Sequence, residues 1–213
     1  MTKQKKFIPR DYQRKIYEVF DSGKYNKAVI ALPRGSGKDI TAFNTAVRQC
    51  LKKKSLVYYV CHYFMVQRNP VWGNFASSVP QSSYEEAKLT FNNGSVLRIV
   101  SPSEIGRAVM AAYEDLKKSP DGIVISEPDW VSPDLCRRAL VLPHWSLIIG
   151  TPFGKRVLYE AYNKGLKRPD TFTYKLTIDD TKHAPLSEIE RVRKEGLLSE
   201  DDIKRAFYSE FIE

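Results

Sequence analysis

Residues 28–41, AVIALPRGSGKDIT, constrain the fold of this chain more than any other stretch. The apolar start of this segment predicts a buried strand, which Pro33 breaks before a helix begins near Lys38. Gly35 and Gly37 let the connecting loop adopt positive φ angles, so that its backbone can lie close to a bound anion. A strand, a glycine-containing loop and a helix in this order predict an α/β fold with an anion site at the helix N-terminus.

The loop is similar to the phosphate-binding P-loop, G-x-x-x-x-G-K-[ST], whose lysine reaches the β- and γ-phosphates of a nucleotide. The backbone amides of Ser36, Gly37 and Lys38 would form the phosphate cradle. Two positions depart from the motif, since Leu32 replaces the first glycine and Asp39 replaces the final hydroxyl residue. The alternative is a chance Arg-Gly-Ser-Gly-Lys sequence in a basic surface turn, but the strand and the helix around the loop favour the phosphate site.

Composition limits the class of protein. The 213 residues, 42% of them hydrophobic, suffice for one substantial core and predict a single domain. The 34 Lys and Arg against 25 Asp and Glu give a formal net charge of +9, which suits a polyanionic partner, nucleic acid first. Three cysteines without metal-ligand spacing indicate buried thiols in a reducing compartment. Because no membrane-spanning run or signal-peptide pattern occurs, we expect a cytosolic protein with no membrane partner.

A helix is predicted from residue 9 to about residue 22, ahead of the first strand. It carries Tyr12 and Gln13. A glutamine amide can pair with both N6 and N7 of adenine, and an aromatic ring can cover the base. We therefore interpret this pair as an adenine contact; the alternative is an ordinary amphipathic helix with a polar glutamine at its rim.

Several further elements are predicted along the chain. A helix is expected over residues 38–52, and the β-branched and aromatic residues at 55–61 predict a second buried strand. Asn93-Gly94 lies between two alternating runs, which predicts a β-hairpin across residues 88–101 with a type I′ turn.

Two regions carry candidates for contact with a partner. Gln67, Arg68 and Trp72 could follow a DNA backbone, although aromatic residues at helical spacing lie more often in a core. Arg107 could serve an ATP site in a neighbouring subunit, as arginine fingers do, although an exposed arginine more often has no such role.

A second group of candidate residues follows the apolar strand predicted at 123–125. Ligand groups collect at the C-terminal edge of an open parallel sheet, and Glu127 stands just beyond that edge. In a Walker B element an aspartate that holds Mg²⁺ precedes a glutamate that polarises the attacking water. Ser126 takes the aspartate position here and Glu127 the glutamate position; the alternative is a strand end with a solvated glutamate. Residues 145–154 predict another buried strand, after which the Thr151 hydroxyl is a candidate γ-phosphate sensor.

Together these motifs resemble the ATPase domain of the large terminase subunit, the DNA-packaging motor of tailed bacteriophages. Residues 172–211 also resemble the strand and two helices that close that domain, so the resemblance covers essentially the whole chain. The four motifs that carry it, in order, are Tyr12-Gln13, residues 33–39, residues 125–130 and residues 150–154.

The resemblance implies a P-loop NTPase of the additional-strand, RecA-like type. Its sheet would be mostly parallel and flanked by helices, with a small β-hairpin insertion. The strand before Thr151 would lie between the strands that precede the P-loop and Glu127. The implied parts of this single ATPase domain are an adenine-binding helix (1–26), a P-loop core (27–165), and a closing strand with C-terminal helices (166–213).

The resemblance also implies a role for each candidate residue, with ATP and Mg²⁺ as the bound groups. Lys38 would bind phosphates, Arg34 would approach the γ-phosphate, Glu127 would be the general base and Thr151 would link hydrolysis to movement. Residues that would bind the nucleotide are Tyr12, Gln13, Gly35, Ser36, Gly37, Lys38 and Asp39.

The two departures from the Walker motifs lie at positions that normally contact the metal. We interpret them as an exchange, in which Asp39 supplies the carboxylate and Ser126 the hydroxyl, with Glu127 nearby. In the alternative, Asp39 only favours the helix N-terminus, Ser126 is a neutral replacement, and Glu127 alone holds the metal through water.

The implied partners are double-stranded DNA, a portal protein and a small terminase subunit, with the chain assembled as a ring in the host cytoplasm at the procapsid portal. A nuclease domain follows in that family, but this sequence stops at residue 213, so we expect no nuclease activity. Asp179, Asp180, Asp201 and Asp202 are interpreted as helix caps. Two other functions stay open: a helicase-like fragment without its second RecA-like lobe, and a non-hydrolysing scaffold, which the serine at 126 would suit.

Overall fold

The computed structural model describes residues 8–61, 79, 82–85, 87–106 and 120–213. Gln67, Arg68, Trp72 and Arg107, the candidates for contact with a partner, lie outside these residues. The strands are β1 (Lys27–Ala31), β2 (Leu56–Val60), β3 (Ser82–Glu85), β4 (Lys88–Phe91), β5 (Val96–Val100), β6 (Gly122–Ser126), β7 (Trp145–Gly150) and β8 (Thr171–Lys175). The helices are α1 (Asp11–Asp21), α2 (Lys38–Lys52), α6 (Pro133–Ala139), α7 (Val157–Leu166), α8 (Ile178–Thr181), α9 (Leu186–Lys194) and α10 (Glu200–Tyr208), with a 3₁₀ turn η1 (Pro128–Trp130).

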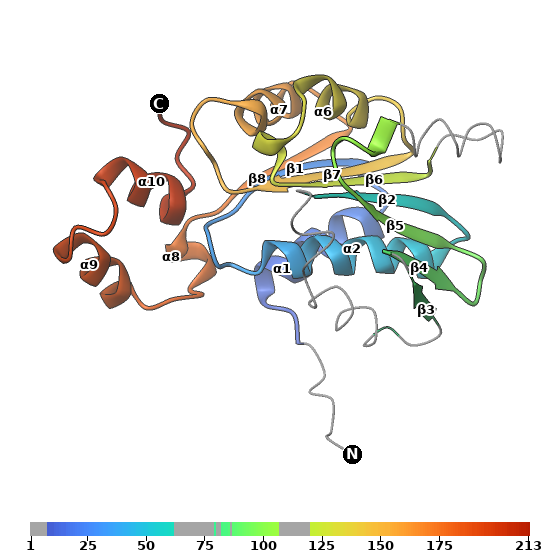
Figure 1. Ribbon diagram of the computed structural model, residues 1–213, viewed down its shortest axis with the longest axis horizontal. Coiled ribbons are helices and arrows are strands. Elements are labelled where there is room, and N and C mark those ends of the chain that lie inside the picture. The colour runs from blue at the N-terminus through green and yellow to red at the C-terminus, as the bar shows by residue number, and fades with distance from the viewer. Residues whose placement is uncertain (1–7, 62–78, 80–81, 86, 107–119) are drawn as a thin grey trace, which may run out of the picture.

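A twisted eight-stranded sheet lies between two layers of helices, with α1 and α2 on one face and α6 and α7 on the other (Figure 1). The strand order is β3-β4-β5-β2-β6-β7-β1-β8. The six strands from β5 to β8 in this order pair in parallel, whereas β3 and β4 pair antiparallel at one edge. The predicted mostly parallel sheet is confirmed, and so is the placement of β7 between β1 and β6.

The central strands β1, β6 and β7 are buried along their whole length because helices cover both faces of the sheet. Side chains alternate between the faces, so Ala28 and Ile30 join a core formed with α1 and α2. Val29 and Ala31 join a second core formed with α6 and α7. The apolar runs predicted to be strands therefore supply both cores at once.

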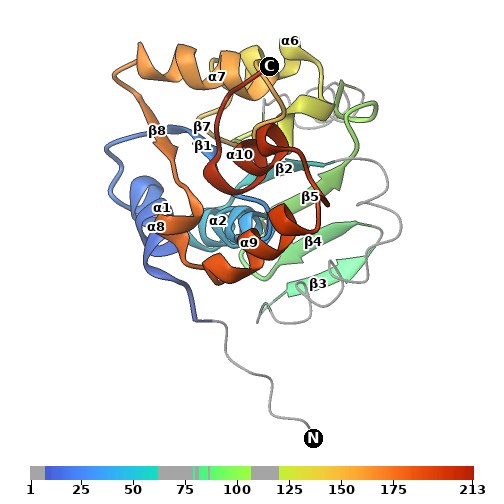
Figure 2. The same ribbon diagram turned by 90° about the vertical axis from the view of Figure 1, so that its left-hand side faces the viewer.

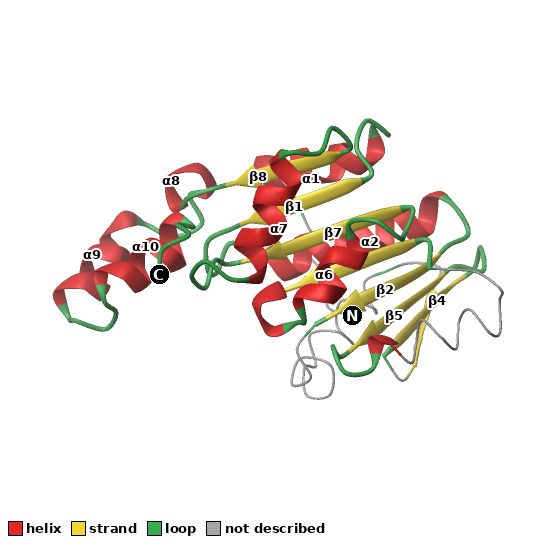
Figure 3. Ribbon diagram, turned by 90° about the horizontal axis from the view of Figure 1, so that it is seen from above, coloured by secondary structure: helices red, strands yellow, loops and turns green. Residues whose placement is uncertain are grey.

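Helices α8, α9 and α10 lie beyond one end of the strands (Figure 3), and Figure 2 shows α9 and α10 in front of that end. They have a small core of their own, formed by Ile178, Ile189, Val192 and Ile203. Three helices follow β8, so the expectation of two was wrong. The sequence after β8 contains a four-residue helix too short for a periodic pattern to identify.

The four aspartates interpreted as caps all lie in the first turns of α8 and α10, where carboxylates favour the helix N-terminus. Asp180 accepts a hydrogen bond of 2.8 Å from the amide of Thr177, and Asp202 accepts one of 2.7 Å from the hydroxyl of Ser199. The capping interpretation is therefore confirmed for Asp180, whereas the cap of α10 is Ser199, which accepts from the Asp202 amide.

The hairpin of β4 and β5 forms as predicted, but its turn does not. A type I′ turn needs positive φ at both central residues, whereas within the described part of the hairpin loop only Gly94 has it, at φ 80°. The Gly94 amide donates to the carbonyl of Phe91 at 2.9 Å, which makes Asn92 and Asn93 the central residues of the turn. The type I′ prediction was wrong because the loop is one residue longer than the dipeptide pattern assumes.

All three cysteines are buried free thiols, as predicted. Among the helices in the described residues, none combines the length and the apolar character needed to cross a bilayer.

Candidate functional site

The loop between β1 and α2 has the conformation that the glycine positions predict. Gly35 and Gly37 have φ angles of 79° and 81°, where only glycine is unstrained. A Cβ atom on Gly37 would lie 3.3 Å from Ile40 Cγ2 and 3.4 Å from Gln13 Nε2. Gly37 also precedes the first turn of α2, whose amides have no partner within the helix. The loop and the helix therefore form a ready-made anion site, in which the positive φ and the tight surroundings of position 37 favour glycine.

Helix α1 braces this loop through the two residues interpreted as an adenine contact. The Tyr12 hydroxyl donates to the Ser36 carbonyl. Gln13 Nε2 donates to Thr41 Oγ1 at 2.8 Å, and Gln13 Oε1 accepts from the Arg10 amide at 2.9 Å. Both side chains are buried. The structure thus gives Tyr12 and Gln13 a positioning role that the sequence pattern did not indicate, and adenine contact stays a prediction.

The candidate catalytic residues meet at the C-terminal edge of the sheet. Lys38 Nζ lies 2.8 Å from Glu127 Oε1 in an ion pair, and Glu127 Oε2 accepts from the Thr151 amide at 3.1 Å. Glu127 has φ 55° and ψ 66°, a left-handed conformation that is uncommon for a residue other than glycine. The Thr151 hydroxyl oxygen is buried and has no hydrogen-bond partner among the described residues.

The two residues that depart from the Walker motifs are in direct contact. Ser126 Oγ donates to Asp39 Oδ1 at 2.7 Å, across the gap between the end of β6 and the start of α2. Tyr59 lies close by; burial raises its pKa well above the usual value, and the negative charge of Asp39 adds to that effect. The two neighbouring residues present one carboxylate and one hydroxyl, and such oxygen donors fit a hard cation such as Mg²⁺.

A cavity of 330 Å³ lies between this edge of the sheet and the C-terminal helices. All four candidate catalytic residues line it, whereas Tyr12 and Gln13 do not. The other walls of the cavity are formed by η1, by the segment after β7, and by α10 together with one residue that precedes this helix. The lining residues are Arg34, Lys38, Glu127, Asp129, Trp130, Thr151, Pro152, Phe153, Leu198, Asp202, Arg205 and Ala206.

Asp129 is a member of this cavity that sequence reasoning missed. Its Oδ1 accepts from the Leu158 amide at 3.0 Å, which ties η1 to the start of α7, and its Oδ2 is buried without a partner in the described part of the chain. Burial is the largest cause that raises the pKa of Asp129, and the hydrogen bond from Leu158 is the largest that opposes it. Its position two residues after Glu127 was the only available signal.

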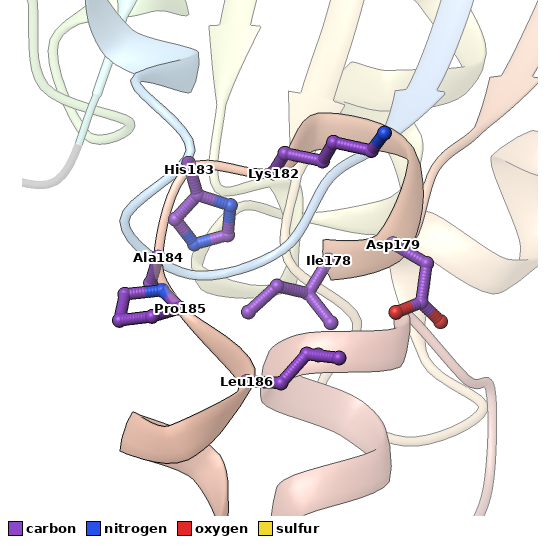
Figure 4. A pocket seen from close by; sticks show the side chains of 7 residues that line it. All are labelled: Ile178, Asp179, Lys182, His183, Ala184, Pro185 and Leu186. Atoms are coloured by element: carbon purple, nitrogen blue, oxygen red, sulfur yellow. The ribbon is translucent and has the colours of Figure 1, made fainter.

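A second cavity, of 590 Å³, lies on the other side of the P-loop between α8 and α9 (Figure 4). His183 Nε2 donates to the Arg34 carbonyl at 2.9 Å, and the ring lies 3.6 Å from where a Cβ atom of Gly35 would be. Burial lowers the pKa of His183, which favours the neutral ring. In Figure 4 Ile178 and Leu186 lie between His183 and Asp179. The connection after α8 therefore supports the P-loop from the C-terminal side, a contact that no local sequence pattern indicates.

No protein-family model matches this chain, and no curated protein sequence matches it. Among solved structures, the large terminase of a thermophilic bacteriophage is similar over 95% of this chain, with a TM-score of 0.68 and 12% identity. The Hef helicase domain of Pyrococcus furiosus is similar over 82% of this chain, with a TM-score of 0.51 and 20% identity. This chain spans 53% of the terminase and 40% of the helicase-domain chain. The resemblance to phage large terminases is thereby confirmed at the level of the fold, and this chain has a P-loop NTPase fold of the additional-strand type.

Proposed function

We propose that this chain is the ATP-hydrolysing motor domain of a phage large terminase, which couples hydrolysis to the translocation of double-stranded DNA into a procapsid. The observation that carries the proposal is the convergence of Lys38, Glu127 and Thr151 beside a glycine-rich anion loop. Phosphoryl transfer to water requires cations that bind the phosphates and a carboxylate that activates the water. The site supplies both, together with a buried hydroxyl at the end of the intervening strand.

The Lys38–Glu127 ion pair suggests how the site changes when a nucleotide binds. A triphosphate in the loop would compete for the Lys38 ammonium, because a phosphate carries more charge than one carboxylate. Glu127 would then be released to accept a proton from the attacking water. Arg34 would stabilise the negative charge that accumulates on the γ-phosphate oxygens.

Mg²⁺, when bound, would neutralise phosphate charge and fix the orientation of the phosphates. Asp39 and Ser126 are the residues proposed to hold it, with Glu127 nearby, because their side-chain oxygens lie together at the sheet edge. Tyr12 and Gln13 are proposed to contact adenine in addition to bracing the loop.

Coupling to movement is proposed to pass through Thr151. Its amide holds Glu127 Oε2, and the segment that it begins leads into α7, which packs on β1 and β8. A change in the charge or position of Glu127 would therefore alter the position of the start of this segment. The formal net charge of +9 suits contact with the DNA backbone, and we propose a ring of subunits acting with a portal protein and a small terminase subunit in the host cytoplasm.

Steady-state hydrolysis of ATP by the purified protein, with Glu127→Gln as the inactive control, tests the proposal. Turnover that requires both Mg²⁺ and Glu127, and that double-stranded DNA stimulates, would support it. Nucleotide binding without turnover would instead favour a non-hydrolysing scaffold, the alternative that the serine at position 126 keeps open.

The likeness to the Hef helicase domain supports a second candidate, a helicase-like ATPase fragment. Separation of a labelled duplex into single strands distinguishes the two functions. A packaging motor moves along duplex DNA without separating its strands, so strand separation that depends on Lys38 would favour the helicase.

A further inference from the structure

Helix α10 and a residue that precedes it form one wall of the cavity that the candidate catalytic residues line. Asp202, Arg205 and Ala206 line the cavity together with Lys38 and Glu127. The Arg34 amide donates to the Ala206 carbonyl at 2.7 Å, so α10 is joined directly to the backbone of the P-loop. The position of α10 relative to the phosphate site is therefore fixed by a hydrogen bond and not by a surface contact alone.

Arg205 brings a guanidinium group into this wall. One of its terminal nitrogens pairs with Asp202 Oδ1 at 2.7 Å, and the other donates to the main-chain oxygen of Glu213 at 3.2 Å. The Arg205 side chain is 22% exposed, whereas that of Asp202 is 45% exposed. The Arg205 side chain as a whole is thus less exposed than that of its partner, which is a helix neighbour three residues away.

Such a pair is easily exchanged. Ion pairs between helix neighbours with a half-exposed partner are weak, because water screens them and both side chains lose freedom. A phosphate binds a guanidinium through two parallel hydrogen bonds and carries more charge than one carboxylate. A phosphate in the cavity would therefore compete effectively with Asp202 for Arg205.

We propose that Arg205 is a catalytic residue that contacts the γ-phosphate from within the same chain, supplied by α10. During hydrolysis the bond between the γ-phosphorus and the ADP oxygen breaks while water attacks, and Glu127 takes the proton of that water. Arg205 takes no proton; it neutralises charge that accumulates on the phosphate oxygens. The proposal rests on the proposed ATPase function and adds to Arg34 a second arginine of the same chain at the γ-phosphate.

The test uses Arg205→Gln, which keeps a hydrogen-bond donor and similar size but removes the charge, and Arg205→Lys, which keeps the charge. Arg191→Ala is the matched control, because Arg191 on α9 forms exposed pairs with Glu188 and Glu195 and does not line the cavity. We expect kcat of Arg205→Gln to fall about 10²- to 10³-fold and its KM for ATP to rise about tenfold, with partial recovery in Arg205→Lys and normal turnover in Arg191→Ala.

A binding measurement separates catalysis from a structural role. Arg205→Gln should bind ADP as the unaltered protein does, but should lose about tenfold in affinity for a non-hydrolysable ATP analogue, because only the analogue carries a γ-phosphate. Equal loss for both nucleotides would overturn the proposal in favour of a structural role, as would unchanged turnover in Arg205→Gln.

Mixing two variants tests the same-chain assignment. In a mixture of Arg205→Gln and Lys38→Ala subunits, no chain has both residues, so the mixture should stay inactive. Recovery of turnover would mean that Arg205 acts on a neighbouring subunit, and would overturn the assignment. If the unaltered protein binds the analogue through Arg205 yet hydrolyses no ATP, the proposed function fails while the contact stands; if it binds no triphosphate, both fail.

Discussion

Ser126 donates a hydrogen bond of 2.7 Å to Asp39, so the two residues that depart from the Walker motifs touch each other. An aspartate has replaced a hydroxyl residue in one motif, and a serine has replaced an aspartate in the other. The pair keeps one carboxylate and one hydroxyl at the sheet edge, which supports the hypothesis that the two positions have exchanged roles.

The exchange predicts a compensating pair of substitutions. Asp39→Ser removes the only carboxylate of the pair and should lower Mg²⁺-dependent turnover about a hundredfold or more. Adding Ser126→Asp should restore much of it, because the carboxylate returns from the other side of the contact. Mg²⁺ titrations of turnover compare the two proteins. A double variant that folds but is no more active than Asp39→Ser would contradict the exchange.

Lys38→Ala and Glu127→Gln should both abolish turnover, but by different routes. Loss of the lysine should weaken ATP binding at least about tenfold, because the phosphates lose a cation. Glu127→Gln should lower kcat about 10²- to 10⁴-fold while ATP binds as well or more tightly, because Lys38 no longer faces the Glu127 carboxylate. Calorimetric titration with ATP provides the measurement. Equal loss of affinity in both variants would exclude Glu127 as the general base.

Asp129→Asn should alter the pH dependence of stability. Burial raises the pKa of Asp129 above 3.8 in the folded state, so the folded protein binds the proton more tightly than the unfolded chain does. The stability from this group is full below pH 3.8 and is lost as the pH rises through the folded-state pKa. At pH 7 the Asp129→Asn variant should therefore be more stable than the unaltered protein. Each kcal/mol gained in the free energy of unfolding should raise its Tm by about 2–4 °C.

Thermal melts of both proteins from pH 4 to pH 8 test this, and the difference between the two curves isolates residue 129 from other titrating groups. A difference that does not change with pH would contradict the raised pKa.

Gly150→Ala should damage the site through crowding. A Cβ atom there would lie 2.7 Å from Pro128 Cδ and 3.1 Å from Glu127 Oε2, so Glu127 or η1 has to move. We expect a loss of about 1–3 kcal/mol in the free energy of unfolding, together with reduced turnover. Gly106→Ala is the control, because no atom of the described residues lies within 4 Å of the added Cβ. Similar behaviour of the two variants in denaturant titrations and ATPase assays would show that the contact does not matter.

DNA binding should fall steeply with salt and vary little with sequence. The chain has an excess of basic residues and no recognised base-reading module, so contact with phosphates should dominate. Fluorescence anisotropy with two unrelated duplexes of equal length should give similar affinities, falling at least about tenfold between ~50 and ~200 mM salt. Binding that stays constant over this range would argue against backbone contact.

The parts of the fold that local patterns specify were predictable from the sequence. Buried apolar runs identified β1, β6 and β7, and the bounds of α2 agree with the prediction at both ends. The hairpin turn was not predictable from Asn93-Gly94 alone. The Asn93 side chain donates to the Cys50 carbonyl at 2.8 Å and accepts from the Ser95 amide at 3.0 Å, and the first of these contacts is with a distant segment.

The same distinction between local patterns and long-range contacts applies to the candidate site. Glu127 and Lys38 belong to motifs with fixed spacing, so their meeting could be anticipated once the strands were recognised. Asp129 and His183 could not be found this way, because each contacts a segment distant in the sequence. Arg205 could not be found either, because its own partners are near neighbours and only the placement of α10 brings it to the cavity. Such residues become visible only when helix ends and loops are placed in space.

The hydrogen bond from the Arg34 amide to the Ala206 carbonyl affects the order in which parts of the protein fold. β1 pairs with β7 and β8, which emerge from the ribosome long after it does. Pairings between distant segments form slowly, because the long intervening loop has to be closed first. The P-loop sequence is therefore synthesised before the strands and the helix that hold it. A nucleotide bound in the completed P-loop would therefore stabilise this protein only after synthesis has passed α10.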